Sequence, residues 1–363
     1  MKSKKFVLAA LALLAAITMA LLPLAGCKND TVPETPEAKQ EQAGGTEGNN
    51  DSTNTEDNND STNTEDNNDS INTEDNTSGN SPGTVVKDAL TINNVRLGKT
   101  SEVQVLSTKV TFASLYEEGV DSNVFISGRG GEIQPFVMGQ YEVTQQLYEA
   151  VMGSNPSKFT SDVETGELQE LRPVETVSWH GAVVFCNELT KKVLGDGACV
   201  YYSDAEFTAV YTTDDGAAKK TPYMDISKSG YRLPTEAEWE LAARGGDPGA
   251  GAWQNTYAGS GTIDGLAWYV NNSSSKTHEV GKKEPNRLKL YDMSGNVAEW
   301  CWDWRSKSIT AATPSDGAAD GSTRVLRGGG WLNKVDNCAV SYCFFGIPGD
   351  TRLRGFRLVR SAK

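Results

Sequence analysis

The chain has 363 residues and carries 48 acidic against 34 basic side chains, a formal net charge of −14. A nucleic-acid-binding surface needs clustered positive charge to displace phosphate counterions, so this balance argues against a nucleic-acid partner. The two histidines, His180 and His278, nearly exclude multi-histidine metal sites and leave little material for a Ser-His-Asp triad. Beyond the N-terminus no apolar run reaches about 18 residues, so no internal membrane span is predicted.

The N-terminal segment has the organisation of a secretory signal. Three lysines precede an apolar stretch from Phe6 to Leu22, and Leu24-Ala25-Gly26-Cys27 closes it. Small residues before a cysteine resemble a bacterial lipobox, which implies that residues 1–26 are a lipoprotein signal peptide and that Cys27 is acylated. An ordinary signal peptide or an uncleaved anchor is the alternative. Because several acyl chains anchor a protein stably, we expect a bacterial membrane protein, in the outer membrane or at the cell surface.

Residues 27–83 are predicted to be a disordered, acidic tether. The part from 28 to 82 holds 14 acidic residues and two lysines, and its nine-residue unit at 51–59 recurs at 60–68 and, slightly altered, at 69–77. Such a tract cannot bury enough apolar surface to offset its conformational entropy. Random-coil scaling gives it a root-mean-square span of roughly 40 Å, so it would hold the remaining chain off the membrane.

The composition becomes globular from about Val103, and the first regular elements follow soon after. Apolar and β-branched residues predict a strand over 136–143. Thr144 then stands where a helix N-cap belongs, and the pattern predicts a short helix from Gln145 to Met152.

Two further helices are predicted, and then little regular structure. Ser178 can cap a helix from Trp179 to about Val193, with an apolar stripe on one face. The Thr235-Glu236-Ala237-Glu238 segment is a capping box, which opens a helix that runs to Arg244 and stops at two glycines. The rest, 247–363, consists of short apolar runs separated by Gly, Asn, Asp and Ser, which indicates one irregular domain rather than a βαβ array.

Six motifs along this region resemble the formylglycine-generating enzyme family, also called sulfatase-modifying factor domains. They are Tyr141-Glu142-Val143-Thr144, the run from Pro173 to Trp179, the run from Tyr231 to Glu240, the run from Ser294 to Trp300, the run from Arg327 to Trp331, and Gly355-Phe356-Arg357. The resemblance covers roughly 105–361 and implies an α+β fold, the irregular, coil-rich C-type-lectin-like fold of the formylglycine-generating-enzyme subtype. We therefore assign 84–363 to one such domain.

The resemblance also implies a calcium site. In the family, the matching segment wraps a calcium ion, and by position the ligands here would be the side chains of Asp292 and Glu299 and the carbonyls of Gly295 and Val297. An all-oxygen set of this kind suits a hard cation. The alternative is that Glu299 merely caps the backbone amides of a tight turn.

The cysteines bear on whether the domain is an oxidase. In the family's oxidases, two cysteines five positions apart bind copper and activate oxygen, and Cys338 and Cys343 have that spacing. Counted back from Gly355-Phe356-Arg357, however, Cys343 falls where many non-oxidase members have an arginine. Cysteines of an exported protein more often form disulfides or fill the core, and the five after Cys27 would leave one thiol over, for which we choose Cys343.

The segment 330–354 resembles the variable region of a target of diversity-generating retroelements. Its aromatic, Cys, Gly, Ile, Leu, Asp, Thr and Arg residues can arise when adenines of asparagine codons are altered; the alternative is an ordinary paralogue with a hydrophobic loop. Rigid aromatic side chains make efficient binding surfaces. The residues expected on a binding face are Trp331, Asn333, Asp336, Tyr342, Phe344, Phe345, Ile347, Asp350, Leu353 and Arg354.

Three classes of function remain. The first, which we favour, is a tethered surface protein, a monomer, that binds an unknown protein or other surface ligand. The second is a formylglycine-generating oxidase that uses Cys338 and Cys343, with copper as its cofactor. The third is a structural lipoprotein of the envelope.

Overall fold

The computed structural model describes residues 82–106, 110–111, 132–306, 309–310, 314 and 316–362. The chain divides into two units, Met1–Ile71 and Asn72–Lys363, and every described residue belongs to the second. The predicted signal peptide, Cys27 and all but the last two residues of the tether lie outside the described residues. None of the described helices is long and apolar enough to cross a membrane.

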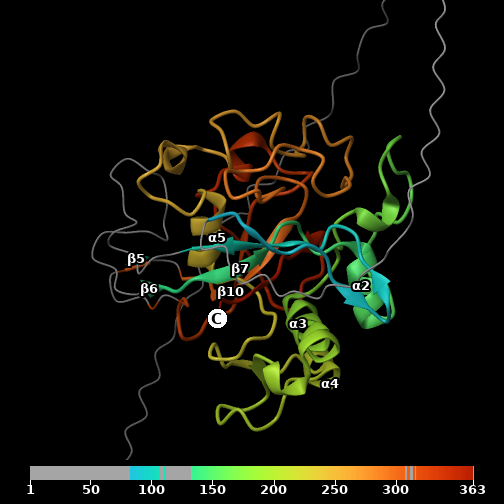
Figure 1. Cartoon of the computed structure of the whole chain (residues 1–363), viewed down its shortest axis with the longest axis vertical. Coiled ribbons are helices and arrows are strands. Elements are labelled where there is room, and N and C mark those ends of the chain that lie inside the picture. The colour runs from blue at the N-terminus through green and yellow to red at the C-terminus, as the bar shows by residue number, and fades with distance from the viewer. Residues whose placement is uncertain are drawn as a thin grey trace, which may run out of the picture. The chain divides into compact units, whose positions relative to one another are not determined.

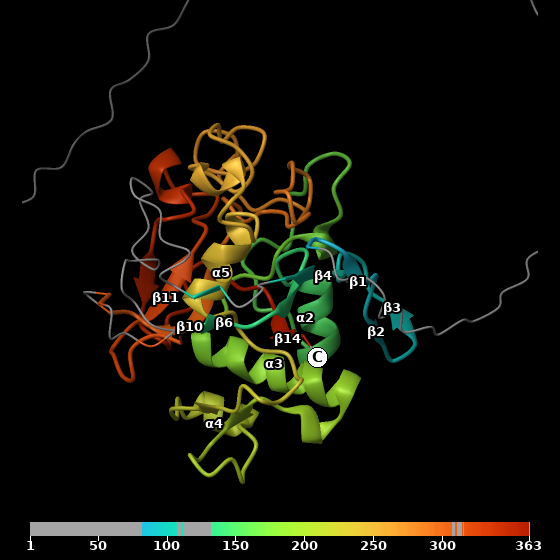
Figure 2. The ribbon, with the colours of Figure 1, turned by 60° about the vertical axis from the view of Figure 1, so that its left-hand side comes forward.

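One four-stranded antiparallel sheet joins the two ends of the described chain. Its order is β1 (Val85–Lys87), β4 (Glu102–Val105), β7 (Phe136–Gly139) and β14 (Val359–Ser361). In the register, Met138 of β7 lies opposite Val103 on one side and Val359 on the other. The last strand therefore returns to the first part of the domain, and the C-terminus lies beside β14 (Figure 2).

A second four-stranded sheet is built from the C-terminal third. Its order is β12 (Phe344–Gly346), β11 (Arg324–Arg327), β10 (Ala298–Trp304) and β13 (Arg354–Gly355). The pairs β12–β11 and β11–β10 are antiparallel, and β13 runs parallel to β10. The sequence predicted little regular structure in this region, whereas its buried apolar runs pair into a sheet.

Short elements complete the described chain. Three two-stranded ladders pair β2 (Thr91–Ile92) with β3 (Val95–Arg96), β5 (Val110–Thr111) with β6 (Glu132–Ile133), and β8 (Tyr201–Tyr202) with β9 (Tyr223–Met224). The 3-10 helices are η1 (Gln169–Leu171), η2 (Asp196–Ala198), η3 (Gly251–Gln254) and η4 (Val335–Cys338). Between 247 and 297, η3 is the one regular element, which agrees with the irregular chain predicted there.

The three predicted helices are confirmed with their caps. They are α2 (Gln145–Met152), α3 (Trp179–Leu194) and α5 (Glu236–Ala243), and a fourth helix, α4 (Thr213–Ala217), lies against α3 (Figure 1). The hydroxyl of Thr144 accepts a hydrogen bond from the amide of Leu147, and both bonds of the Thr235–Glu238 capping box are present. These side chains bond amides that the first helical turn leaves without partners, so local sequence sets where each helix begins.

The predicted strand over 136–143 is too long, because β7 ends at Gly139. Beyond it the main chain leaves the ladder: the amide of Gln140 donates to Ser101 and that of Val143 to Phe356. This bend turns Glu142 into the interior, where its carboxylate accepts from the Asn296 side chain at 2.8 Å and from the Val297 amide at 3.0 Å. A strand pattern could not show this, because the partners of Glu142 are about 150 residues away.

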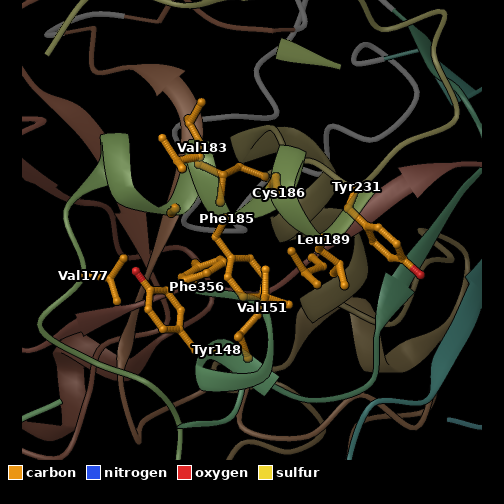
Figure 3. Close-up of a cluster of buried hydrophobic side chains, with 14 of the residues drawn as sticks. Tyr148, Val151, Val177, Val183, Phe185, Cys186, Leu189, Tyr231 and Phe356 are labelled. Atoms are coloured by element: carbon orange, nitrogen blue, oxygen red, sulfur yellow. The ribbon is translucent and has the colours of Figure 1, made fainter. Parts of the chain in front are cut away.

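The largest core cluster packs α2 and α3 against the chain end. The ring of Tyr148 stacks on Phe185 at 5.1 Å, and Phe356 meets Phe185 edge-on at 5.2 Å (Figure 3). Burial of such aromatic side chains stabilises the fold by about 1.5–3 kcal/mol each. The Gly355-Phe356-Arg357 motif is therefore fixed by packing on both helices, and the observed mixture of helices and sheets confirms the predicted α+β class.

Candidate ligand-binding groove and its surroundings

A groove of about 330 Å³ lies over the second sheet. Its lining combines strand residues of this sheet with residues of the loops that follow β11 and β12: Ala298, Leu326, Gly330, Trp331, Leu332, Asn333, Phe344, Phe345, Arg352, Leu353 and Arg354. A volume of this size is at the lower end of the range for ligand pockets, roughly 300–1,000 Å³. The groove can therefore take one or two side chains of a partner rather than a large molecule.

Strand β12 places two aromatic side chains at the groove. Phe344 lies opposite Leu326 and Phe345 opposite Val325 of β11. Successive side chains of a strand alternate in direction, yet both rings contribute to the groove lining and differ in burial. Phe344 is half-buried and packs against the core cluster of α2 and α3, while Phe345 is 52% exposed and has the guanidinium of Arg305 4.5 Å from its ring.

Glycines fix both ends of the segment that carries the rim. Gly329 has a φ of 71°, and a Cβ there would lie 2.7 Å from the carbonyl oxygen of Asn337. A Cβ on Gly355 would lie 2.6 Å from the carbonyl oxygen of Val174. Both positions require glycine, so the loop is held at both ends while the side chains between them remain free to differ.

Six of the ten residues predicted for the binding face line this groove. They are Trp331, Asn333, Phe344, Phe345, Leu353 and Arg354. Trp331 is only 7% exposed and meets Phe159 edge-on at 5.2 Å, so it is largely a wall of the groove.

The other four predicted residues lie outside the lining. The ring of Tyr342 is 4.7 Å from that of Phe344, and Ile347 is 59% exposed. Asp336 is exposed on η4. Asp350 forms ion pairs with Arg352 and Arg354.

Asp350 holds the two arginines of the rim. Arg352 bonds it from Nε at 3.0 Å and from Nη2 at 2.7 Å, and Arg354 bonds it from Nη1 at 2.5 Å. These bonds, those of Arg352 foremost, keep the pKa of the Asp350 carboxyl well below its usual range. The Arg354 guanidinium also lies 5.2 Å from the ring centre of Trp300. One carboxylate thus orients two cations at the groove.

Sequence reasoning did not assign a binding role to several groove residues. Leu332 and Arg352 lie inside the 330–354 segment, so its boundaries already contained them. The floor residues Ala298 and Leu326 gave no such signal, because they are ordinary apolar strand residues that only the sheet brings under the loop.

Cys338 and Cys343, the two cysteines that an oxidase would use, lie in separate apolar clusters. Cys338 is fully buried in a cluster with Tyr257 and Ala267, and burial raises the pKa of its thiol to about 12. Cys343 packs against a different cluster, and burial likewise raises the pKa of its thiol. Copper binding and thiol chemistry need a thiolate, which these surroundings disfavour.

The expectation that pairing would leave one thiol over is wrong for the described cysteines. All five, Cys186, Cys199, Cys301, Cys338 and Cys343, are free, and only Cys343 is not fully buried. They fill the core rather than cross-link the chain, as small apolar side chains do.

Of the side chains expected to hold calcium, Glu299 is fully engaged with protein and Asp292 is engaged through one oxygen. Both oxygens of Glu299 accept from Arg357 at 2.7 Å, and the Trp239 indole also donates to it at 2.7 Å. Asp292 accepts from the Gly281 amide through Oδ2, while its buried Oδ1 has no partner in the described structure.

For Glu299 to bind an ion, its carboxylate would have to share or leave Arg357, whereas Oδ1 of Asp292 is without a protein partner among the described residues. In the described part of the chain, no group of three or more His, Cys, Asp or Glu side chains is placed to hold a metal ion. Calcium at Asp292, Gly295, Val297 and Glu299 stays a prediction from the family resemblance.

The fold belongs to a known class of domain. The family model for the sulfatase-modifying factor enzyme 1-like domain matches residues 109–362, so the chain belongs to that family, as its motifs predicted. Among solved structures, Treponema denticola variable protein 1 is 37% identical with a TM-score of 0.65, over 77% of this chain and 100% of that one.

Two curated relatives differ in how much of them is shared. The chaperone protein LppX of Paenibacillus barcinonensis is 36% identical over 256 residues, which are 65% of this chain and 83% of the relative. The formylglycine-generating enzyme of Streptomyces coelicolor is 40% identical over 127 residues, which are 32% of this chain and only 39% of that enzyme.

Proposed function

We propose that this protein is a lipid-anchored bacterial surface protein that binds a polypeptide ligand in the groove over the β10–β13 sheet, and that it is not an oxidase. The observation that carries the proposal is the groove itself. Its floor, formed by the buried Leu326 and the partly buried Ala298, belongs to the second sheet, while aromatic and charged side chains of the 330–354 segment form its rim. A rigid floor with an exchangeable rim suits a binding face, because the rim can vary without loss of the core.

The exposed apolar side chains beside the groove support this function. Phe345, Ile347 and Tyr342 are 52%, 59% and 39% exposed, and they follow one another along a six-residue stretch. Apolar surface of this kind on a soluble domain commonly marks an interaction site. Aromatic side chains contribute much contact area at low entropic cost, so they anchor interfaces well.

Two features argue against the oxidase. Burial raises the pKa of the Cys338 and Cys343 thiols and so disfavours their thiolates, and the two thiols pack into different apolar clusters. A copper site would need both thiolates to face a common position.

The relatives agree with a polypeptide ligand and with variation of the rim. LppX is described as a chaperone, a class of protein that acts on polypeptides. The likeness to Treponema denticola variable protein 1 supports diversification of 330–354 in this chain as well. Sequencing several clonal isolates should show substitutions confined to codons of this segment; identical segments in all isolates would count against diversification.

The test of binding removes exposed rim side chains and leaves the core alone. Phe344 contacts the core cluster, so it is kept, and Phe345→Ser with Ile347→Ser removes the two exposed groups. The matched control is Tyr223→Ser with Ile226→Ser, since these side chains are 43% and 51% exposed and do not line the groove. Binding of the labelled protein to cells and the melting temperature are measured for both.

We expect the rim variant to lose binding and the control to keep it. Both should melt within a few degrees of wild type, because exposed side chains contribute about 0.5 kcal/mol or less to folding. A folded rim variant that binds like wild type would place the interface elsewhere.

A further inference from the structure

The charged residues that line the groove are all of one sign. Arg352 and Arg354 contribute two guanidinium groups, and the remaining nine lining residues are uncharged. This contrasts with the whole chain, whose net charge is −14. Asp350 lies behind the two arginines and neutralises one of the two positive charges, so the rim keeps a net charge of about +1.

Arg354 is held in one position and still has donors to offer. Its side chain is 15% exposed, its Nη1 bonds Asp350, and its guanidinium lies over Trp300. Within the described structure, Nε and Nη2 have no hydrogen-bond partner. A guanidinium fixed on one side and unpaired on the other needs little further ordering to bind a ligand, which favours affinity.

The neighbouring lining is apolar. Leu332, Phe344 and Leu353 line the groove together with Arg354. A ligand that fills it must therefore place an anionic group beside an apolar one. The planar fork of an arginine matches a carboxylate, to which it can donate two parallel hydrogen bonds.

We propose that the groove binds an aspartate or glutamate side chain of the partner polypeptide next to an aliphatic or aromatic residue. Arg354 donates to the carboxylate, and Asp350 is a positioning residue that holds Arg354. This inference rests on the proposed function, since it names the chemistry of the ligand at that same groove.

The experiment uses the full chain with Cys27→Ala, which leaves it unacylated. Two capped tripeptides serve as probes, leucyl-glutamyl-leucine amide and its glutamine counterpart, and NMR titration gives their affinities. We expect the glutamyl peptide to bind at least about tenfold more tightly, because a charge-assisted hydrogen bond is stronger than the neutral one that glutamine can accept. Arg354→Met should reduce its affinity to that of the glutamine peptide. Arg96→Met removes an arginine that is 69% exposed and does not line the groove, so it should change the affinity less than about threefold.

Asp350→Asn separates positioning from simple electrostatics. The substitution makes the groove more positive, so charge alone predicts tighter binding of the glutamyl peptide. Loss of the ion pair frees the Arg354 side chain, so positioning predicts weaker binding, by about tenfold. Tighter binding in this variant would reject the role given to Asp350.

The remaining outcomes distinguish failure of the acidic-ligand inference from failure of the proposed binding function. Equal affinity for the two peptides overturns the inference, and so does sulfate that competes as well as the glutamyl peptide, because the site would then accept any anion. If the probes show no preference while the Phe345→Ser, Ile347→Ser variant still loses cell binding, the binding function stands and the acidic ligand is wrong. If that variant binds cells normally, the binding function itself fails, whatever the peptides do.

Discussion

Arg357 and Glu299 form a fully buried, bidentate ion pair. Nε of Arg357 donates to Oε2 of Glu299 and Nη2 donates to Oε1, both at 2.7 Å. The indole of Trp239 donates to the same carboxylate. The pair thereby joins the end of the chain to β10 and to α5, and it fixes the strand that forms the floor of the groove.

Removing one partner of this pair should lower the free energy of unfolding of the domain. For Arg357→Met we expect the free energy of unfolding to fall by about 3–5 kcal/mol, because the carboxylate of Glu299 would remain buried without a countercharge. Urea denaturation followed by tryptophan fluorescence measures this. Arg352→Met, whose side chain is exposed, is the control and should change the value by about 0.5 kcal/mol or less. A loss below about 1 kcal/mol for Arg357→Met would contradict the assignment.

Ionisation of the buried Asp292 carboxyl should make the fold less stable as pH rises. Burial raises the pKa of its carboxyl from 3.8 to about 6, so the folded state binds the proton more tightly than the unfolded state. Its contribution to stability is therefore fully present below pH 3.8 and decreases as pH rises to about 6, by at most about 3 kcal/mol.

Asp292→Asn isolates this contribution from those of other acids. The asparagine oxygen can still accept from the Gly281 amide, and the side chain stays neutral. We expect the variant to gain stability relative to wild type between pH 4 and pH 7, measured by urea denaturation at each pH. A constant difference across this range would show that Asp292 does not titrate there.

Calcium should have little effect on stability if Arg357 already neutralises Glu299. We expect the same melting temperature in calcium and in chelator, measured by differential scanning calorimetry. A rise of several degrees in calcium that disappears with Asp292→Ala would instead establish the ion predicted from the sequence. Bound calcium would also remove the decrease in stability between pH 4 and pH 7, because the metal would favour the ionised form of Asp292.

The thiols near the groove should be unreactive in the folded protein. With a pKa of about 12, the Cys338 thiol is ionised in only about one molecule in ten thousand at pH 8, and it is also buried. Iodoacetamide should therefore modify Cys338 and Cys343 slowly until urea is added, as mass spectrometry would show. Thr351→Cys, at an exposed position of the same segment, is the control for a reactive thiol. Rapid modification of both native cysteines, with tight copper binding, would favour the oxidase.

Cys27 should carry the lipid. Since it is the sole cysteine near the signal sequence, Cys27→Ala should abolish acylation and move the protein from the detergent phase to the aqueous phase on phase separation. Cys343→Ala should leave the partition unchanged. A Cys27→Ala protein that still enters the detergent phase would contradict the lipid anchor.

The sequence by itself determined the features that depend on neighbouring residues. Thr144, Ser178 and Thr235 each begin a helix because a hydroxyl reaches an amide within three residues along the chain. The six motifs likewise predicted the family and the α+β fold, since together they contain helix caps, glycines and buried tryptophans that a local pattern can show.

Only the tertiary structure decided which distant groups meet. Glu142 accepts a hydrogen bond from Asn296. Arg357 forms an ion pair with Glu299, whose carboxylate was predicted from the sequence to bind calcium. Phe344, Leu326 and Ala298 come from three strands of one sheet, so the groove has a lining that no single stretch of sequence contains. Periodicity and capping act over a few residues, whereas burial, charge compensation and groove formation depend on contacts between segments far apart in the chain, which one sequence read in order does not specify.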